Sequence, residues 1–130
     1  MFKNYIIICF LGMLAIILGA FGAHALKESL TAVELLSFET AVRYQMYHVI
    51  VLLFVNMYAG FSVKQKNTIS WLFFFGIFFF SGSIYAIQLT KLTAKLIWFI
   101  TPLGGLLLVL GWGYMMRYFI TKELKKIRKA

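Results

Sequence analysis

Two residues of opposite charge, Glu39 and Arg43, stand four positions apart inside a largely apolar sequence. On a helix this spacing places both side chains on one face, in the favourable order of acid before base. Such a pair could hold an ion or a polar head group. The simpler hypothesis is a structural pair that anchors its helix at a membrane interface.

The two histidines, His24 and His48, raise the question of a metal or a haem. A haem between two helices would need both rings at the same depth, but His24 ends its helical segment and His48 lies well inside another. The chain has no third histidine, no Asp and only one cysteine, Cys9. We therefore expect hydrogen-bonded histidines, no metal and no cofactor, and an inert thiol at Cys9.

Most polar residues of the apolar segments fall near one end of the predicted bundle. His48 lies on the opposite helix face from Glu39 and pairs better with Tyr44 and Gln45. The opposite half contains little besides Asn56. The candidate binding layer consists of His24, Glu39, Arg43, Tyr44, Gln45, His48 and Gln88.

Enzymatic activity is not expected. The sequence contains no nucleophile elbow, no phosphate-binding glycine loop and no metal-ligand motif. A glutamate with a histidine could exchange protons, but nothing in the sequence points to a substrate.

The composition indicates how these residues are positioned. Hydrophobic residues make up 62% and charged residues 13% of the 130 residues, whereas soluble domains are about a quarter charged. The net charge of +9 would suggest nucleic acid in a soluble protein, but no aromatic-interleaved basic surface accompanies it. We predict an all-α integral membrane protein, a bundle of four transmembrane helices, with no nucleic-acid partner.

Four apolar stretches are long enough to span a bilayer, at about 4–25, 43–63, 68–89 and 96–116. The second helix begins earlier, because Thr31 and Glu34 form a capping-box pattern, so it could extend from Ala32 to Gly60 or be kinked before residue 43. The membrane domain covers 1–118 and a basic tail covers 119–130. A signal peptide ending near Ala25 is the alternative for the first stretch.

Lysine and arginine are distributed unequally between the two sides of this bundle. With four spans, nine of them lie on the side of the termini and four on the other side. The positive-inside rule then predicts that both termini are cytoplasmic. The basic tail should lie near anionic lipid head groups, although an acidic protein partner is the alternative.

Small residues recur at helical spacing in three of the four stretches, which is typical of close helix packing in membranes. The predicted packing positions are Gly12, Ala15, Gly19, Gly22, Ala23, Gly82, Ala86, Gly104, Gly105 and Gly111.

Four segments carry a resemblance to a known family. They read GAFGAHALK at residues 19–27, FETAVRYQMYH at 38–48, SGSIYA at 81–86 and TPLGGL at 101–106. On these motifs the chain resembles the small bacterial inner-membrane proteins of the YgdD/YwdK family, known as DUF423 or UPF0382, over about residues 5–118. The resemblance implies four spans in the bacterial inner membrane and no established activity.

Two functions remain open. The first is a non-enzymatic protein that acts by association, as a homo-oligomer or as an accessory subunit of a larger membrane complex. The alternative is a small oligomeric transporter or channel for an ion, small solute or lipid that uses the polar layer. The apolar half of the bundle opposes the alternative, because a conducting path would have to cross it.

Overall fold

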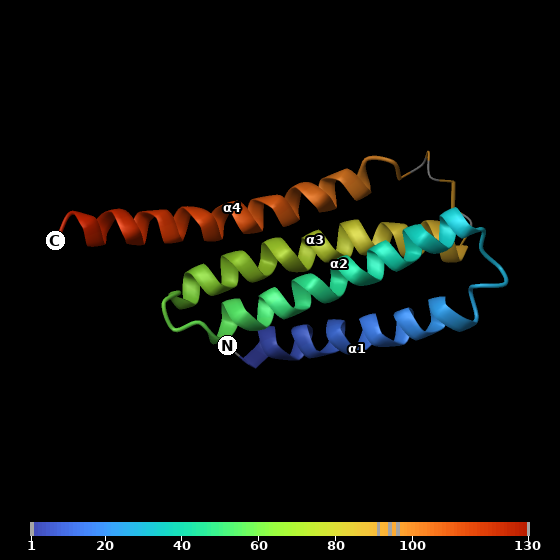
Figure 1. Cartoon of the computed structure of the whole chain (residues 1–130), viewed down its shortest axis with the longest axis horizontal. Helices are drawn as coiled ribbons and strands as arrows, with labels where there is room; N and C mark the ends of the chain where they lie inside the picture. Colours follow the sequence, from blue (N-terminus) through green and yellow to red (C-terminus); the bar gives the residue numbers. More distant parts are fainter. Residues whose placement is uncertain (1, 91, 94, 96, 130) are drawn as a thin grey trace.

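The computed structural model describes residues 2–90, 92, 93, 95 and 97–129 and consists of four long helices (Figure 1). They are α1 Phe2–His24, α2 Ala32–Met57, α3 Val63–Thr90 and α4 Ile100–Ile127. Successive helices alternate in direction, and α1 packs on α2, α2 on α3 and α3 on α4. Both chain ends therefore lie at the same end of the bundle, where α4 projects beyond the other helices.

Helix α2 begins with the predicted capping box and is continuous. The Glu34 backbone N–H donates to Thr31 Oγ1 at 3.3 Å, and the Thr31 backbone N–H donates to Glu34 Oε2 at 2.8 Å. The prediction of a helix start at Ala32 is confirmed, and the helix runs without a break to Met57. A second capping box, between Ser62 and Gln65, begins α3 and was not predicted.

Three of the helices, α1, α3 and α4, are long and apolar enough to cross a membrane. Helix α2 is less apolar because Glu34, Glu39 and Arg43 lie in its first half. Large apolar side chains cover the outside of the bundle; on α1 they include Ile6, Met13 and Ile16. A continuous apolar exterior of this extent is typical of a surface in contact with lipid.

Small residues set the register between α1 and α2. Cβ atoms added at Gly12 and Gly19 would lie 3.3 Å from Val49 and Val42, and one at Gly22 would lie 2.9 Å from the Phe38 ring. Ala15 is buried on the same face. Residues 12–22 of α1 therefore lie antiparallel to residues 38–49 of α2, so that the two helices run side by side through the bundle.

The α3–α4 contact depends on closer approaches still. A Cβ atom at Gly104 would lie 2.2 Å from the Phe80 backbone nitrogen, and one at Gly111 would lie 2.7 Å from the Phe73 ring. Gly76, which was not among the predicted positions, faces Leu108 in the same way. The backbones of α3 and α4 approach each other so closely only because these positions carry no side chain.

The other predicted packing positions make looser contacts. A Cβ atom at Gly105 would be 3.7 Å from the Phe80 ring, and one at Gly82 would have no atom within 4 Å. Ala23 is exposed, and Ala86 is half-buried. Small size therefore serves helix contact at some of the ten positions and not at others.

Candidate functional site

The residues of the predicted polar layer do not converge on one site. Gln45 and His48 are buried inside the bundle, at 1% and 6% exposure, whereas Glu39 and Arg43 lie on its surface. His24 is exposed at the end of α1, Tyr44 is exposed on α2, and Gln88 is half-buried in the last turn of α3. The layer is divided because successive residues of one helix point in different directions.

Gln45 connects three helices. Its Nε2 donates to the Leu11 backbone oxygen on α1 at 2.7 Å, and its Oε1 accepts from the Tyr85 hydroxyl on α3 at 2.8 Å. The Tyr85 ring also packs against Phe38, with 5.2 Å between ring centroids. In an apolar interior such bonds satisfy groups that would otherwise be costly to bury, so Gln45 is a structural link between helices.

Both ring nitrogens of His48 have hydrogen-bond partners. A carbonyl oxygen can only accept and an indole N–H can only donate, so Nδ1–H donates to the Tyr44 oxygen at 2.7 Å and Nε2 accepts from Trp112 Nε1 at 3.3 Å. This assignment describes a neutral ring, which packs against Phe73. His48 therefore joins α2 to α4, and it would have to give up a partner to bind a metal.

The two histidines are far apart along the bundle. His24 lies beyond Gly22, which faces Phe38, and Phe38 is ten residues or about 15 Å from His48 along α2. Among the described residues, no group of three or more His, Cys, Asp and Glu side chains is placed to hold a metal ion. The arrangement offers neither a pair of axial haem ligands nor a metal-ligand set.

Glu39 and Arg43 form the ion pair expected from their spacing. Arg43 Nη1 lies 3.8 Å from Glu39 Oε2, and both side chains are nearly half exposed, at 48% and 47%. Arg43 Nη2 also donates to Thr40 Oγ1 at 3.1 Å. Beside the pair is a shallow pocket of about 170 Å³, lined also by Gly19, Phe38 and Val42. Within the candidate layer, the charged groups of this pair lie on the surface of the bundle, as do His24 and Tyr44.

A second polar cluster lies at the other end of the bundle and was missed in the sequence, apart from Asn56. Asn4 Nδ2 donates to Asn56 Oδ1 at 3.0 Å and to Asn67 Oδ1 at 3.1 Å. Asn56 Nδ2 donates to Ser70 Oγ at 2.9 Å, and Lys66 Nζ donates to the Asn56 backbone oxygen at 2.7 Å. The available signal was that Asn4, Asn56 and Asn67 each lie near an end of an apolar stretch, and these ends meet on the same side of the predicted bundle.

Two serines of α3 make further bonds to neighbouring helices. Ser81 Oγ donates to the Ala41 backbone oxygen on α2 at 2.7 Å, and Ser83 Oγ lies 2.6 Å from Thr101 Oγ1 on α4. Among the described residues, every buried side-chain nitrogen and oxygen has a hydrogen-bond partner. The interior polar groups thus hold the helices together and present no unpaired group to a ligand.

Comparison with known proteins places the chain in a family. Residues 18–105 match the family described as protein of unknown function (DUF423). A UPF0382 membrane protein of Staphylococcus saprophyticus is 46% identical over 100 residues, which is 77% of this chain and 82% of the relative. The UPF0382 membrane protein YwdK of Bacillus subtilis is 38% identical over 102 residues, covering 77% and 81% of the two chains.

No solved structure matches this chain. The relatives are membrane proteins by name, which agrees with the three apolar helices long enough to cross a bilayer. The expected resemblance is confirmed by both the matched region and the level of identity. The chain therefore belongs to the DUF423 (UPF0382) family of membrane proteins of uncharacterised function.

Proposed function

We propose that this protein is a non-enzymatic, four-span protein of the bacterial inner membrane that acts by association with a second copy or with another membrane subunit. The antiparallel register supports four spans: residues 38–49 of α2 lie beside residues 12–22 of α1, so α2 crosses the same depth as α1. Hydrogen bonds from Gln45 to α1 and from Ser81 of α3 to the Ala41 backbone oxygen satisfy polar groups of α2 inside the bundle, as a spanning helix requires.

The proposed orientation has both termini in the cytoplasm, because nine of the thirteen lysines and arginines are on that side. We expect a protease added outside intact spheroplasts to leave a C-terminal epitope tag in place. The same protease should remove the tag after the membrane is opened. Loss of the tag from sealed spheroplasts would reverse the proposed orientation.

The observation that carries the association proposal is the half-exposed Glu39–Arg43 pair. Arg43 is thirteen residues, or about 20 Å, from Asn56 along α2, and the hydrocarbon core of a bilayer is about 30 Å thick. With the Asn56 cluster at one interface, the pair lies inside the outer boundary of the hydrocarbon. Charged side chains that face lipid at this depth are costly, and polar groups of a neighbouring subunit would relieve that cost.

The experiment is gentle extraction of the protein from native membranes, followed by native mass spectrometry. We expect an assembly of several copies or a stoichiometric complex with another protein. Arg43→Ala should weaken it about tenfold or more, because truncating one partner of a covered charge pair leaves the other charge unpaired. Lys27→Ala, which removes an exposed charge between α1 and α2, is the control and should leave the assembly intact.

The result that would overturn association is a parent protein that is monomeric under all mild conditions, or an Arg43→Ala assembly as stable as the parent. The alternative function, an oligomeric transporter or channel, is favoured by the same pair, since the charges could line a path between subunits. Flux into liposomes that is abolished by Glu39→Gln would support the alternative. If neither the parent protein nor Glu39→Gln carries flux, the transporter or channel function is wrong.

A further inference from the structure

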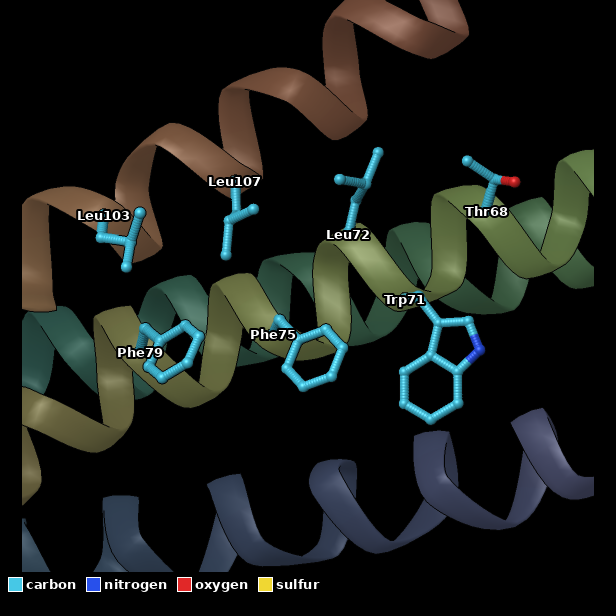
Figure 2. A pocket seen from close by; sticks show the side chains of 7 residues that line it. All are labelled: Thr68, Trp71, Leu72, Phe75, Phe79, Leu103 and Leu107. Atoms are coloured by element: carbon cyan, nitrogen blue, oxygen red, sulfur yellow. The ribbon is translucent and has the colours of Figure 1, made fainter.

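One side of the α3–α4 contact contains a groove of about 580 Å³ (Figure 2). Trp71, Phe75 and Phe79 of α3 form a row along it, and Leu103 and Leu107 reach toward it from α4. The lining is completed by Leu72 and, at one end, by Thr68. Its volume falls within the range of about 300–1,000 Å³ that is usual for small-molecule sites.

A separate polar pocket of about 260 Å³ lies nearer the end of the bundle that holds the chain termini. It is lined by Gln65, Tyr114, Arg117, Tyr118 and Thr121. Gln65, Thr68 and Leu72 follow each other at three- and four-residue intervals on α3, while Leu107, Tyr114 and Thr121 follow at seven-residue intervals on α4. Residues at such intervals share a helix face, so the two cavities lie on the same side of the contact.

Arg117 supplies the charge of this pocket. Its guanidinium carries five N–H donors, and within the described part of the chain it has no ion-pair partner. A neighbouring pocket of about 330 Å³ shares Gln65, Tyr118 and Thr121 with the Arg117 pocket, and its lining also includes Lys122 and Lys125. This end of the α3–α4 contact is therefore strongly cationic, whereas the groove is apolar.

We propose that the α3–α4 groove binds an anionic phospholipid, with an acyl chain along the Phe75–Leu107 groove and the phosphate at Arg117. Arginine donates paired hydrogen bonds to phosphate, and the Gln65 amide adds N–H donors to the same pocket lining, whereas the Thr121 hydroxyl already donates to the Arg117 backbone oxygen at 2.8 Å. An apolar groove followed, on the same side of the α3–α4 contact, by a cationic pocket matches the structure of such a lipid from chain to head group.

Charge decides against a second copy of the chain as the occupant. An identical subunit at this end of the groove would bring its own Arg117, Lys122 and Lys125 toward those already present, and like charges repel. An anionic head group has the complementary charge. This inference is independent of the association proposal, which rests on the opposite end of the bundle.

The test uses the full-length protein, purified in detergent and stripped of lipid. Phosphatidylglycerol and phosphatidylcholine with identical acyl chains are titrated separately, and retained lipid is measured by native mass spectrometry. We expect phosphatidylglycerol to bind about five- to tenfold more tightly, because both lipids offer a phosphate but the choline cation of phosphatidylcholine would be repelled by Arg117, Lys122 and Lys125. Arg117→Gln should abolish this preference.

Lys126→Gln is the control, since it removes one positive charge from the same helix at a position that lines neither the groove nor any of the pockets near Arg117. Circular dichroism of both variants should equal that of the parent. Equal binding of the two lipids, or equal loss of the preference in both variants, would overturn the proposal by making the attraction a general effect of the basic tail.

Fluorescence of Trp71 reports the acyl chain. Phosphatidylglycerol with brominated chains should quench the parent protein, and the quenching should be smaller in Trp71→Phe. Millimolar inorganic phosphate should not displace the lipid, because the chain provides part of the binding. Displacement by phosphate alone would overturn the lipid assignment. The lipid assignment would also be overturned if the lipid-free protein were a dimer and Leu103→Trp, which fills the groove, made it a monomer, because a second copy would then occupy the groove.

Discussion

Replacement of Gly104 by alanine is expected to lower the free energy of unfolding by about 3 kcal/mol, the upper end of the usual cost of overpacking. The added Cβ would lie 2.2 Å from the Phe80 nitrogen and 2.6 Å from the Phe79 carbonyl carbon. These are backbone atoms inside a helix, so they cannot move aside as a side-chain tip would. Helix α4 would have to shift away from α3 as a whole.

The neighbouring glycine provides the control. A Cβ at Gly105 would make an ordinary contact with the Phe80 ring at 3.7 Å, so Gly105→Ala should lie within about 0.5 kcal/mol of the parent. Equilibrium unfolding in mixed detergent micelles, followed by circular dichroism, gives both values. Equal stability of the two variants would mean that α3 and α4 are not packed as closely as the structure has them.

Asn56→Leu is expected to have the second largest effect, a loss of about 2–3 kcal/mol. The Asn56 side chain accepts from Asn4 and donates to both Ser70 Oγ and the Leu52 backbone oxygen. It is 1% exposed, so water cannot replace these bonds. Leucine is of similar size and would leave the Ser70 hydroxyl without this partner in an apolar interior.

Asn67→Leu is the matched control for this substitution. Asn67 is exposed and accepts a single hydrogen bond from Asn4. Asn4 keeps its other bond, to Asn56, when Asn67 is replaced. The free energy of unfolding should therefore fall by less than about 1 kcal/mol. The double variant Asn4→Leu/Asn56→Leu should cost less than the sum of the single variants, because both partners of one bond are removed together. Strict additivity would argue against the Asn4–Asn56 bond.

Hydrogen-bond partners were the least predictable part of this protein. Gln45 and His48 were singled out because polar groups in apolar segments need a reason. Apart from the Tyr44 backbone oxygen beside His48, however, their side-chain partners stand far away in the sequence: Tyr85 is 40 residues from Gln45, and Trp112 is 64 residues from His48. Nothing in the local pattern identifies Trp112, which reads as one more aromatic residue in an apolar helix.

The glycines illustrate the same limit. Gly82 and Gly104 look alike in the sequence, since each stands among small residues near the end of an apolar stretch. In the structure a Cβ at Gly104 would collide with the backbone of α3, whereas one at Gly82 would meet no atom within 4 Å. The difference is a rotation of each helix about its own axis, which composition does not encode.

The sequence by itself determined that this is a helical membrane protein, that Thr31 and Glu34 cap the second of its helices, and to which family it belongs, but not that the fourth helix runs through the expected tail to Ile127. These properties follow from apolarity, capping and motifs, which are local along the chain. The tertiary structure alone decided that the polar layer divides into buried links and a surface ion pair, that Asn4 joins Asn56, and that an apolar groove and the Arg117 pocket lie on one side of the α3–α4 contact. Those outcomes depend on the register and rotation of whole helices, which are set by contacts between residues far apart in the sequence.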